Sequence, residues 1–336
     1  MRKVLSLAQP IMESYLHHAY QTSIIGNEEK SMPWVLSNYI QLYFDGNDAL
    51  PVQFYMPDET GYTWNVACPF LDVQLIKKET ITGLHLDIIE CIIYALNNES
   101  YVITYINENH VPQKPSYQNR DFSHMFFIYG YDQEKKVFHH LGYNMENNNR
   151  KFGTIEVAFQ DFVDAYYNNP EYLFHSHDKL FMAKPNCNFQ YDFNVERVLD
   201  QLQQLLHSNR QQQFNDDPNH VFGLDVYGNF RRIIQQSLEN GNELKIPPFL
   251  LLAEHKKIMQ LRLEYMNRLK QFESFQKEQN RYRQLEQRLI FLRNAALLYN
   301  RTKRSEAMES MMDEIMDIRA EEADILDTII HRMNLG

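Results

Sequence analysis

The chain has 336 residues and a formal net charge of −11, and 44% of its residues are hydrophobic. This length and hydrophobic content are sufficient for two domains with separate cores. The acidic balance argues against a nucleic-acid backbone or an anionic membrane surface as the main partner, because both require clustered lysine and arginine. The three cysteines, Cys68, Cys91 and Cys187, form neither a C-x-x-C pair nor an even-numbered disulfide framework. We therefore expect a reducing, cytoplasmic location, without a membrane span.

The first 190 residues mix helical and strand patterns. Apolar residues at helical spacing after Pro10 predict a helix over 11–25, and a second amphipathic segment follows over 33–44. Thr82 is placed to cap a helix over 84–97. Aromatic and β-branched residues predict strands over 101–106, 125–131, 137–143, 154–158 and 172–184, with a short helix over 160–167. This pattern predicts an α+β domain over residues 1–190, with an N-terminal helix and an antiparallel sheet.

The remaining residues, 191–336, read as an all-α domain. Leucine and valine at helical spacing predict a helix over 194–208, and a second helix is expected over 230–238. Pro247 and Pro248 suit the start of a long helix, expected over residues 248–300. A last helix ends the chain, and we expect the two end helices to pack as an antiparallel hairpin.

The most informative stretch for chemistry is the hairpin predicted over residues 121–144. His124 lies at the start of its first strand, and Asn144 lies at the exit of its second strand. Antiparallel pairing brings these two ends together, so a histidine base and a polar group that orients it could meet there. The alternative interpretation is a surface histidine that precedes a core strand.

A nucleophile is harder to identify. Cys91 lies on the apolar stripe of its helix, Cys68 is expected to be a packed side chain, and nothing marks Cys187 as reactive. Ser14 lies in the first turns of the N-terminal helix, where backbone N–H groups and the helix dipole can stabilise an oxyanion. Gln9 could add a side-chain donor. Alternatively, Ser14 is an ordinary helix serine and Gln9 a surface residue.

Histidine clusters raise the question of a metal site. His17 and His18 are adjacent, so on a helix their side chains should diverge by about 100° and could not share one ion. His175 and His177 share one strand face, but two residues do not make a site. Glycine-rich phosphate loops are absent from the sequence. We therefore predict neither a metal nor a cofactor.

The N-terminal helix, the Pro33-Trp34 segment and the stretch His-Met-Phe-Phe-Ile-Tyr-Gly-Tyr-Asp at 124–132 together resemble a known family. They are similar to the N-terminal domain of butirosin biosynthesis protein H, over roughly residues 5–185. The resemblance implies a papain-like cysteine-peptidase fold. It also implies transfer of an acyl group from a carrier-protein thioester to an amine, in nonribosomal peptide and related natural-product biosynthesis.

The resemblance implies catalytic roles for Ser14, His124 and Asn144, with Gln9 at the oxyanion. The chain departs from the family at two of these positions. Ser14 stands where the family has its nucleophilic cysteine, and the family's aspartate falls by register near Gly142, two residues before Asn144. A serine hydroxyl is a weaker nucleophile than a thiolate beside an imidazolium.

Three hypotheses follow. The chain is an acyltransferase or hydrolase that uses Ser14; or it is a catalytically inactive relative that binds a carrier protein or a peptide-like ligand; or Ser14 replaces a native cysteine by design. Expected partners are an acyl or peptidyl carrier protein, a small amine or peptide-like substrate, and a second copy through the C-terminal helices. Four arginines of the long helix form either a basic patch for an acidic carrier protein or a solvated face: Arg281, Arg283, Arg288 and Arg293.

Overall fold

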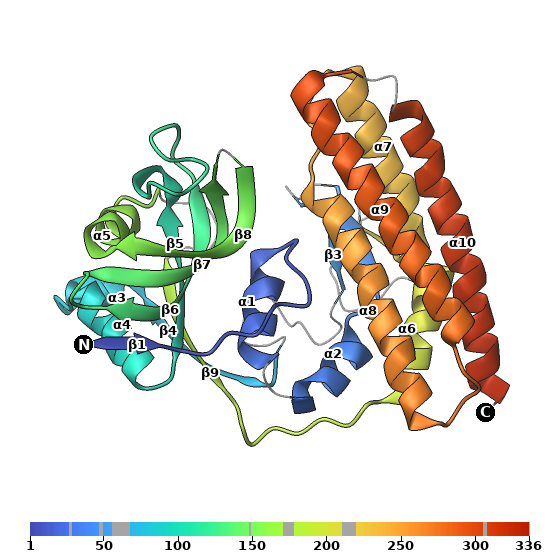
Figure 1. The fold of residues 1–336 in the computed structure, drawn as a ribbon, viewed down its shortest axis with the longest axis horizontal. Helices are drawn as coiled ribbons and strands as arrows, with labels where there is room; N and C mark the ends of the chain where they lie inside the picture. Colours follow the sequence, from blue (N-terminus) through green and yellow to red (C-terminus); the bar gives the residue numbers. More distant parts are fainter. Residues whose placement is uncertain are drawn as a thin grey trace. The chain divides into compact units, whose positions relative to one another are not determined.

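The computed structural model describes residues 1–26, 29–46, 50–55, 68–147, 149–170, 178–209, 220–304 and 308–335. The chain forms two compact units. Unit 1 comprises Met1–Glu29 and Glu59–Phe189, and unit 2 comprises Lys30–Asp58 and Gln190–Gly336. The chain is a mixed α/β protein with antiparallel sheets and a helical C-terminal region (Figure 1).

Unit 1 is built on a seven-stranded sheet. Its strand order is β4-β9-β5-β6-β7-β8, and β1 pairs with β6 off this path. The strands are β1 (Arg2–Val4), β4 (Leu71–Lys77), β5 (Tyr101–Asn107), β6 (Ser123–Asp132), β7 (Val137–Glu146), β8 (Asn149–Ala158) and β9 (Lys179–Pro185). Every pairing in the sheet is antiparallel. The predicted hairpin is therefore confirmed as β6 and β7, and the predicted strand over 154–158 is the second half of a longer β8.

Both faces of β6 are buried, because alternate side chains meet different helices. Phe126 packs against Phe162 of α5 (Phe159–Tyr167), whereas Phe127 stacks on Tyr20 of α1 (Leu16–Ile25). Helix α1 accordingly lies on one side of the sheet, while α3 (Lys78–Gly83), α4 (Ile88–Asn97) and α5 lie on the other (Figure 1). Period-two alternation in a strand covered on both sides explains the near-continuous apolar run in the sequence.

The predicted helix over 84–97 is wrong at its start. Helix α3 ends at Gly83, and α4 begins only at Ile88. The cap is Asp87, whose carboxylate accepts hydrogen bonds from the backbone N–H groups of Ile89 and Glu90. Thr82 instead bonds back into α3 through its hydroxyl. Aspartate is a strong N-cap residue, and it defines the real helix boundary.

Unit 2 combines a small sheet with long helices. Its sheet has the order β10-β2-β3, with β2 (Leu42–Asp45), β3 (Val52–Phe54) and β10 (His220–Phe222). The helices are α2 (Met32–Asn38), α6 (Val195–His207), α7 (Val226–Glu239), α8 (Pro247–Leu269), α9 (Gln276–Thr302) and α10 (Met308–Leu335). The predicted helix over 33–44 is thus a short helix followed by a strand. The division predicted from composition, at residue 190, left Lys30–Asp58 in the first domain, whereas β2 of this segment pairs with β10 and the segment belongs to unit 2.

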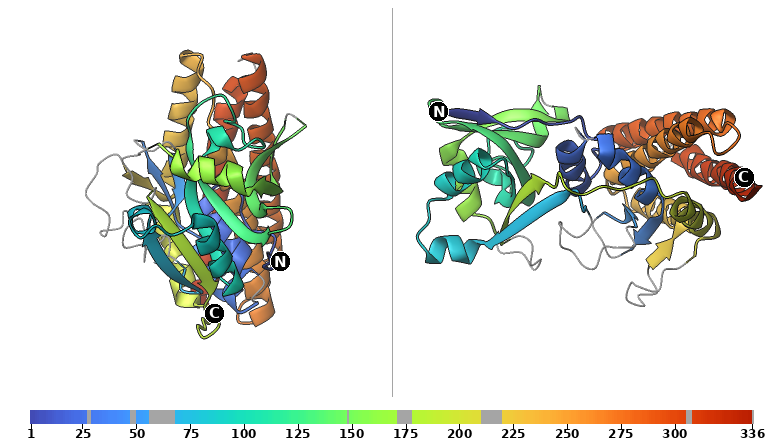
Figure 2. Two further views of the ribbon diagram at one scale, coloured as in Figure 1. Left: turned by 90° about the vertical axis from the view of Figure 1, so that its left-hand side faces the viewer. Right: turned by 90° about the horizontal axis from the view of Figure 1, so that it is seen from below.

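The predicted single helix over 248–300 is two helices, α8 and α9. Helix α8 ends at Lys270, which has a left-handed backbone with φ of 56°. The backbone N–H of Phe275 then donates to the Asn267 side chain across the turn. Helices α8, α9 and α10 run side by side, in orange to red in Figure 2.

The core of unit 2 encloses a charged cluster. The Lys256 ammonium contacts both carboxylate oxygens of Glu322 at 2.5 Å, and the Tyr227 hydroxyl donates to Glu322 at 2.7 Å. His255 lies 2.9 Å from the same ammonium and bonds the Ile40 carbonyl with its other nitrogen. The side chains of Lys256, Glu322 and His255 are fully buried. Helices α7, α8 and α10 are therefore joined by ionic hydrogen bonds as well as by apolar contacts.

Candidate active site

The end of the β6–β7 hairpin holds the predicted base and its predicted partner. The paired register runs from Asp132↔Val137 to Phe127↔Leu141. His124 and Asn144 each lie three residues beyond the last of these pairs, at the same end of the hairpin. The structure therefore brings both residues to one end of the sheet, as the hairpin pattern predicted.

Helix α1 reaches this end through Tyr20. The Tyr20 hydroxyl donates to the Met125 carbonyl of β6 at 3.3 Å. It also lies close to β7, since a Cβ placed on Gly142 would come within 3.0 Å of it. The same Cβ would lie 2.8 Å from His140 Nε2, so the His140 ring and the Tyr20 hydroxyl together favour glycine at position 142.

His124 is oriented by Glu108, a residue that the sequence interpretation missed. The His124 Nδ1 lies 2.7 Å from Glu108 Oε1. Glu108 belongs to a short 3₁₀ helix, Glu108–His110, directly after β5, and it is 2% exposed. Because β5 pairs with β6, the start of that 3₁₀ helix falls beside the start of β6. A carboxylate immediately after a strand was the available signal, but the sequence does not say which strand lies next to it.

The electrostatics of Glu108 favour its charged form. Burial raises the pKa of the Glu108 carboxyl, but the hydrogen bond and charge of His124, with contributions from Lys114 and Arg150, outweigh burial and leave that pKa below its ordinary value. An ionised carboxylate accepts the Nδ1 proton of His124. In this tautomer Nε2 carries a lone pair, and among the described residues Nε2 has no hydrogen-bond partner. The His124 side chain is 24% exposed, so part of it is accessible from solvent.

A second histidine at this end is held in a closed network. His140 donates from Nδ1 to the Phe127 carbonyl at 2.9 Å and stacks on Phe126, with ring centroids 3.8 Å apart. Its Nε2 accepts from the Lys114 ammonium at 2.7 Å. The pKa of Lys114 is lowered to about 8, mainly by burial. The charge of Glu108 opposes this effect, and the charge of Arg150 adds to it. Both ring nitrogens of His140 therefore have partners within the fold, whereas His124 has a partner at Nδ1 alone among the described residues.

The segment that carries Ser14 runs beside β7. The Tyr143 hydroxyl donates to the Glu13 carbonyl at 2.9 Å, which ties residue 13 to the strand next to Asn144. Ser14 is 5% exposed and precedes α1, whose N-cap is Tyr15. Ser14 and His124, which both belong to the described residues, are not hydrogen-bonded to each other. Hydrogen bonds of catalytic groups often form only when substrate is bound. The prediction that Ser14 and His124 act as nucleophile and base therefore stays a prediction.

Two other predicted groups have different partners. The Asn144 amide donates to the Gly142 and Gly153 carbonyls, both at 2.9 Å, which makes Asn144 a link between β7 and β8. The orienting group of His124 is thus Glu108 in this structure. The Gln9 amide donates to Glu13 Oε1 at 2.9 Å, so its free donor capacity toward an oxyanion is reduced.

The expected divergence of His17 and His18 is wrong. Their Nε2 atoms are 3.1 Å apart and their ring centroids 4.0 Å apart. Both lie in the first turn of α1, where the side-chain torsions turn the rings toward each other despite the 100° offset of their Cα atoms. Burial lowers the pKa of His17 to about 4. Among the described residues no cluster of three or more His, Cys, Asp or Glu side chains is arranged to bind a metal; the His175 and His177 pair lies outside them.

Burial disfavours the thiolate form of two of the three cysteines. Cys68 is fully buried, and burial raises the pKa of its thiol to about 12. Burial also raises the pKa of Cys91, with Asp87 and Glu90 adding to the effect. Cys187 is exposed and bonds weakly to the Pro185 carbonyl. Cys68 and Cys91 are therefore poorly suited to a thiolate mechanism.

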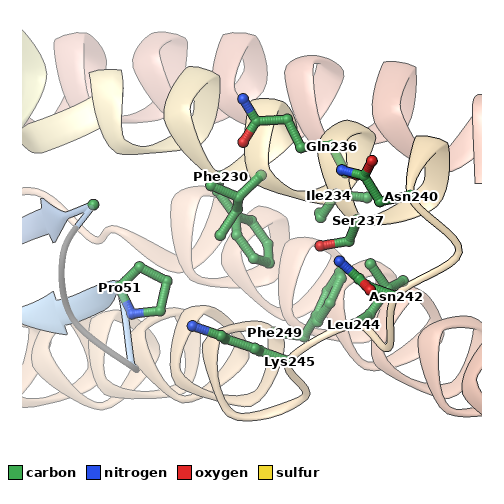
Figure 3. A pocket seen from close by; sticks show the side chains of 12 residues that line it. Pro51, Phe230, Ile234, Gln236, Ser237, Asn240, Asn242, Leu244, Lys245 and Phe249 are labelled. Atoms are coloured by element: carbon green, nitrogen blue, oxygen red, sulfur yellow. The ribbon is translucent and has the colours of Figure 1, made fainter.

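A separate pocket lies in unit 2, with a volume of about 260 Å³ (Figure 3). Phe230 and Ile234 of α7 and Phe249 of α8 form its apolar wall. Asn240 and Asn242, from the loop between these helices, are at its polar side. The titratable side chain among its lining residues is that of Lys245, so the pocket has no acid–base pair of the kind that His124 and Glu108 form.

No protein-family model matches the chain, and no curated protein matches its sequence. None of the helices in the described part of the chain combines the length and apolar character that a bilayer span requires.

Proposed function

We propose that unit 1 is a papain-like acyl-transfer domain in which His124 is the general base and Glu108 orients it. The observation that carries the proposal is the 2.7 Å hydrogen bond between His124 Nδ1 and the buried Glu108 carboxylate. A base of this kind needs one nitrogen fixed by an acceptor and the other open to the reacting group. The proposed reaction moves an acyl group from a carrier-protein thioester to an amine in natural-product biosynthesis.

In the first step the Ser14 hydroxyl oxygen attacks the thioester carbonyl carbon, and its proton passes to Nε2 of His124. Collapse of the tetrahedral intermediate breaks the C–S bond, and the departing sulfur takes that proton and leaves as a thiol. The product of this half-reaction is an ester on Ser14. Throughout, the Glu108 carboxylate stabilises the imidazolium that forms on His124.

In the second step an amine attacks the ester carbonyl and transfers a proton to Nε2. The C–O bond breaks, the Ser14 oxygen recovers its proton from His124, and an amide is released. Backbone N–H groups at the start of α1 are suited to the oxyanion of both steps, because a helix N-terminus carries positive partial charge.

A second candidate function is binding without catalysis. Ser14 is 95% buried and the Gln9 amide already bonds Glu13, which favours a closed cleft over an open catalytic one. In that case unit 1 holds a carrier protein or a peptide-like ligand and does not transform it.

The test is thiol release from an acyl N-acetylcysteamine thioester in the presence of a primary amine. The wild-type chain should release thiol and form amide. His124→Gln should lower kcat/KM by about 10²–10⁴-fold, the usual contribution of a general base. Ser14→Ala should abolish the reaction, and Glu108→Gln should lower kcat, because an amide can hold the imidazole in the wrong tautomer.

His207→Gln is the matched control, since His207 is exposed at the end of α6 and should leave the rate unchanged. The wild-type chain could bind the thioester measurably yet release thiol only at the uncatalysed rate. That result would refute acyl transfer and support the binding function. Equal rates for wild type and His124→Gln would refute the role of His124.

A further inference from the structure

The outer face of α9 carries exposed apolar and basic side chains. Phe291 is 70% exposed and Leu298 is 60% exposed, and their spacing of seven residues puts them on one stripe of the helix. Lys277, Arg283 and Arg301 are also exposed on this helix. Two exposed apolar side chains of this size with basic neighbours indicate a protein-interaction surface.

The acidic residues of α9 do not neutralise this face. Glu278 is buried and bonds Arg332 of α10 at 3.1 Å. Glu286 is half-buried and accepts a hydrogen bond from Gln260 of α8. The exposed stripe of α9 is therefore basic, although the chain as a whole is acidic.

The outer face of α10 has the opposite charge. Asp313, Asp317, Asp324 and Asp327 are all exposed, and their spacings of four, seven and three residues place them on one stripe. Met312 and Met316, which are half-buried, lie beside this stripe. Methionine side chains adapt readily to an incoming apolar group.

The two stripes adjoin within one molecule. Arg281 of α9 bonds Asp324 of α10 at 2.7 Å, and Arg288 bonds Glu314 and Glu321 at 2.5 and 2.7 Å. These partly exposed ion pairs join the antiparallel helices along one seam, with the basic stripe on one side of it and the acidic stripe on the other. Arg281 and Arg288 thus form ion pairs with carboxylates of α10, and they are not free to form the basic patch that the sequence suggested.

We infer that this two-helix surface binds a second copy of the chain. A surface with a basic stripe beside an acidic stripe is self-complementary under a two-fold axis parallel to the helices. Rotation about that axis places α9 of each copy on α10 of the other. An axis perpendicular to the helices would instead place α9 on α9 and α10 on α10, which brings like charges together.

The two-fold axis also fixes the contacts, because rotation about it keeps every residue at its own height. Arg281 lies at the height of Asp324, so the neighbouring Arg283 approaches Asp324 of the second copy, whose side chain is 71% exposed although it also pairs with Arg281 of its own copy. In the same register Lys277, four residues before Arg281, lies at the height of Thr328, four residues after Asp324, so Lys277 meets the adjacent Asp327 of the second copy. Phe291 then lies near the height of Glu314, over Met312 and Met316 of the second copy.

The available area is that of a stable dimer. Helix α9 has 27 residues, which corresponds to a length of about 40 Å, and a helix face is about 10 Å wide. Two such helices per copy present about 800 Å², the usual contribution of one partner to a specific interface.

The test is sedimentation equilibrium of the full chain at about 1–100 µM, a range that spans dimers of moderate affinity. The wild-type chain should be a dimer that weakens in high salt. The single variants Lys277→Glu and Asp327→Lys should each dimerise at least tenfold more weakly. An equimolar mixture of the two variants should recover most of the affinity as a heterodimer, because each reversed stripe then meets a compatible one.

Lys257→Glu is the control, because it makes the same charge change as Lys277→Glu at an exposed position of α8. It should leave dimerisation unchanged. Recovery in the mixture also shows that the variants are folded. A monomeric wild-type chain over this range would overturn the proposal, and the α9 stripe would then be assigned to a different, acidic protein. A dimer that the α9 and α10 variants do not weaken would overturn it as well.

Discussion

Replacing Glu322 by glutamine tests the charged core of unit 2. The substitution keeps the side-chain volume but removes the negative charge that both contacts at 2.5 Å bring to the Lys256 ammonium. Lys256 and Glu322 are fully buried, so the ammonium is left without its counter-ion and without water. Breaking a buried ion pair from one side costs about 3–5 kcal/mol, and whole-domain stability is about 5–15 kcal/mol. We therefore expect Glu322→Gln to remove a large part of the stability of unit 2.

The loss should depend on pH in a direction that the structure fixes. Burial lowers the pKa of Lys256, while Glu322 opposes that effect through its charge and hydrogen bonds. In the variant this opposing effect is gone, so the folded-state pKa of Lys256 falls further below its unfolded value. A base with a depressed folded-state pKa binds fewer protons when folded, and stability then rises with pH between the two pKa values. The deficit of the variant should consequently be largest near neutral pH and shrink toward pH 10.

The assay is urea unfolding followed by tryptophan fluorescence in a Trp64→Phe background. Trp34 then remains as the sole tryptophan, and it is 5% exposed in α2 of unit 2. Glu321→Gln is the matched control, because Glu321 is partly exposed and bonds arginines on the surface seam; its cost should be below about 1 kcal/mol. A cost for Glu322→Gln that equals this control would refute the reasoning.

Three further outcomes follow from unit 1. Because the pKa of Glu108 is lowered in the folded state, its carboxylate adds stability that is lost as the pH falls through that pKa. The difference in free energy of unfolding between wild type and Glu108→Gln, measured by urea unfolding, should therefore shrink at acid pH. A difference that grows there would contradict the account. Gly142→Ala should lower the free energy of unfolding by about 1–3 kcal/mol, because its Cβ would lie 2.8 Å from the His140 ring, and an unchanged value would show that the ring can move away. At pH 8, iodoacetamide should label Cys187 far faster than Cys68 in a mass-spectrometric time course, and equal rates would contradict the burial of Cys68.

The sequence predicted local structure well wherever one periodicity dominated. The β6–β7 hairpin follows from two aromatic runs around a polar turn, and its alternating phenylalanines face different helices. The helices of unit 2 follow from their leucine and methionine stripes. Boundaries were missed where a single residue decides them, as at Asp87, which caps α4, and at Lys270, whose left-handed backbone separates α8 from α9.

Long-range relations could not be predicted from periodicity. Residues Lys30–Asp58 belong to unit 2 because β2 pairs with β10, some 175 residues later in the chain. Their apolar spacing carries no information about that partner. A composition change near residue 190 therefore marked one junction between the units but not the exchange of this segment.

The candidate site was predicted in part for the same reason. His124 and Asn144 share a hairpin, so local pairing was sufficient to bring them to one end of the sheet. Glu108 reaches His124 only because β5 lies beside β6, and that neighbour relation connects segments separated by a polar loop. Sequence reasoning consequently placed His124 at this end of the hairpin but assigned its hydrogen-bond partner to Asn144, the nearer polar residue in the hairpin.

The central claim is that His124 activates Ser14 for attack on an acyl thioester. The most direct measurement is the intact mass of the chain, quenched after mixing with an acyl N-acetylcysteamine thioester in the absence of amine. The account predicts a mass increase of one acyl group on the peptide that contains Ser14, absent from Ser14→Ala and strongly reduced in His124→Gln. An unmodified chain, or an adduct whose yield is unaffected by His124→Gln, would contradict it.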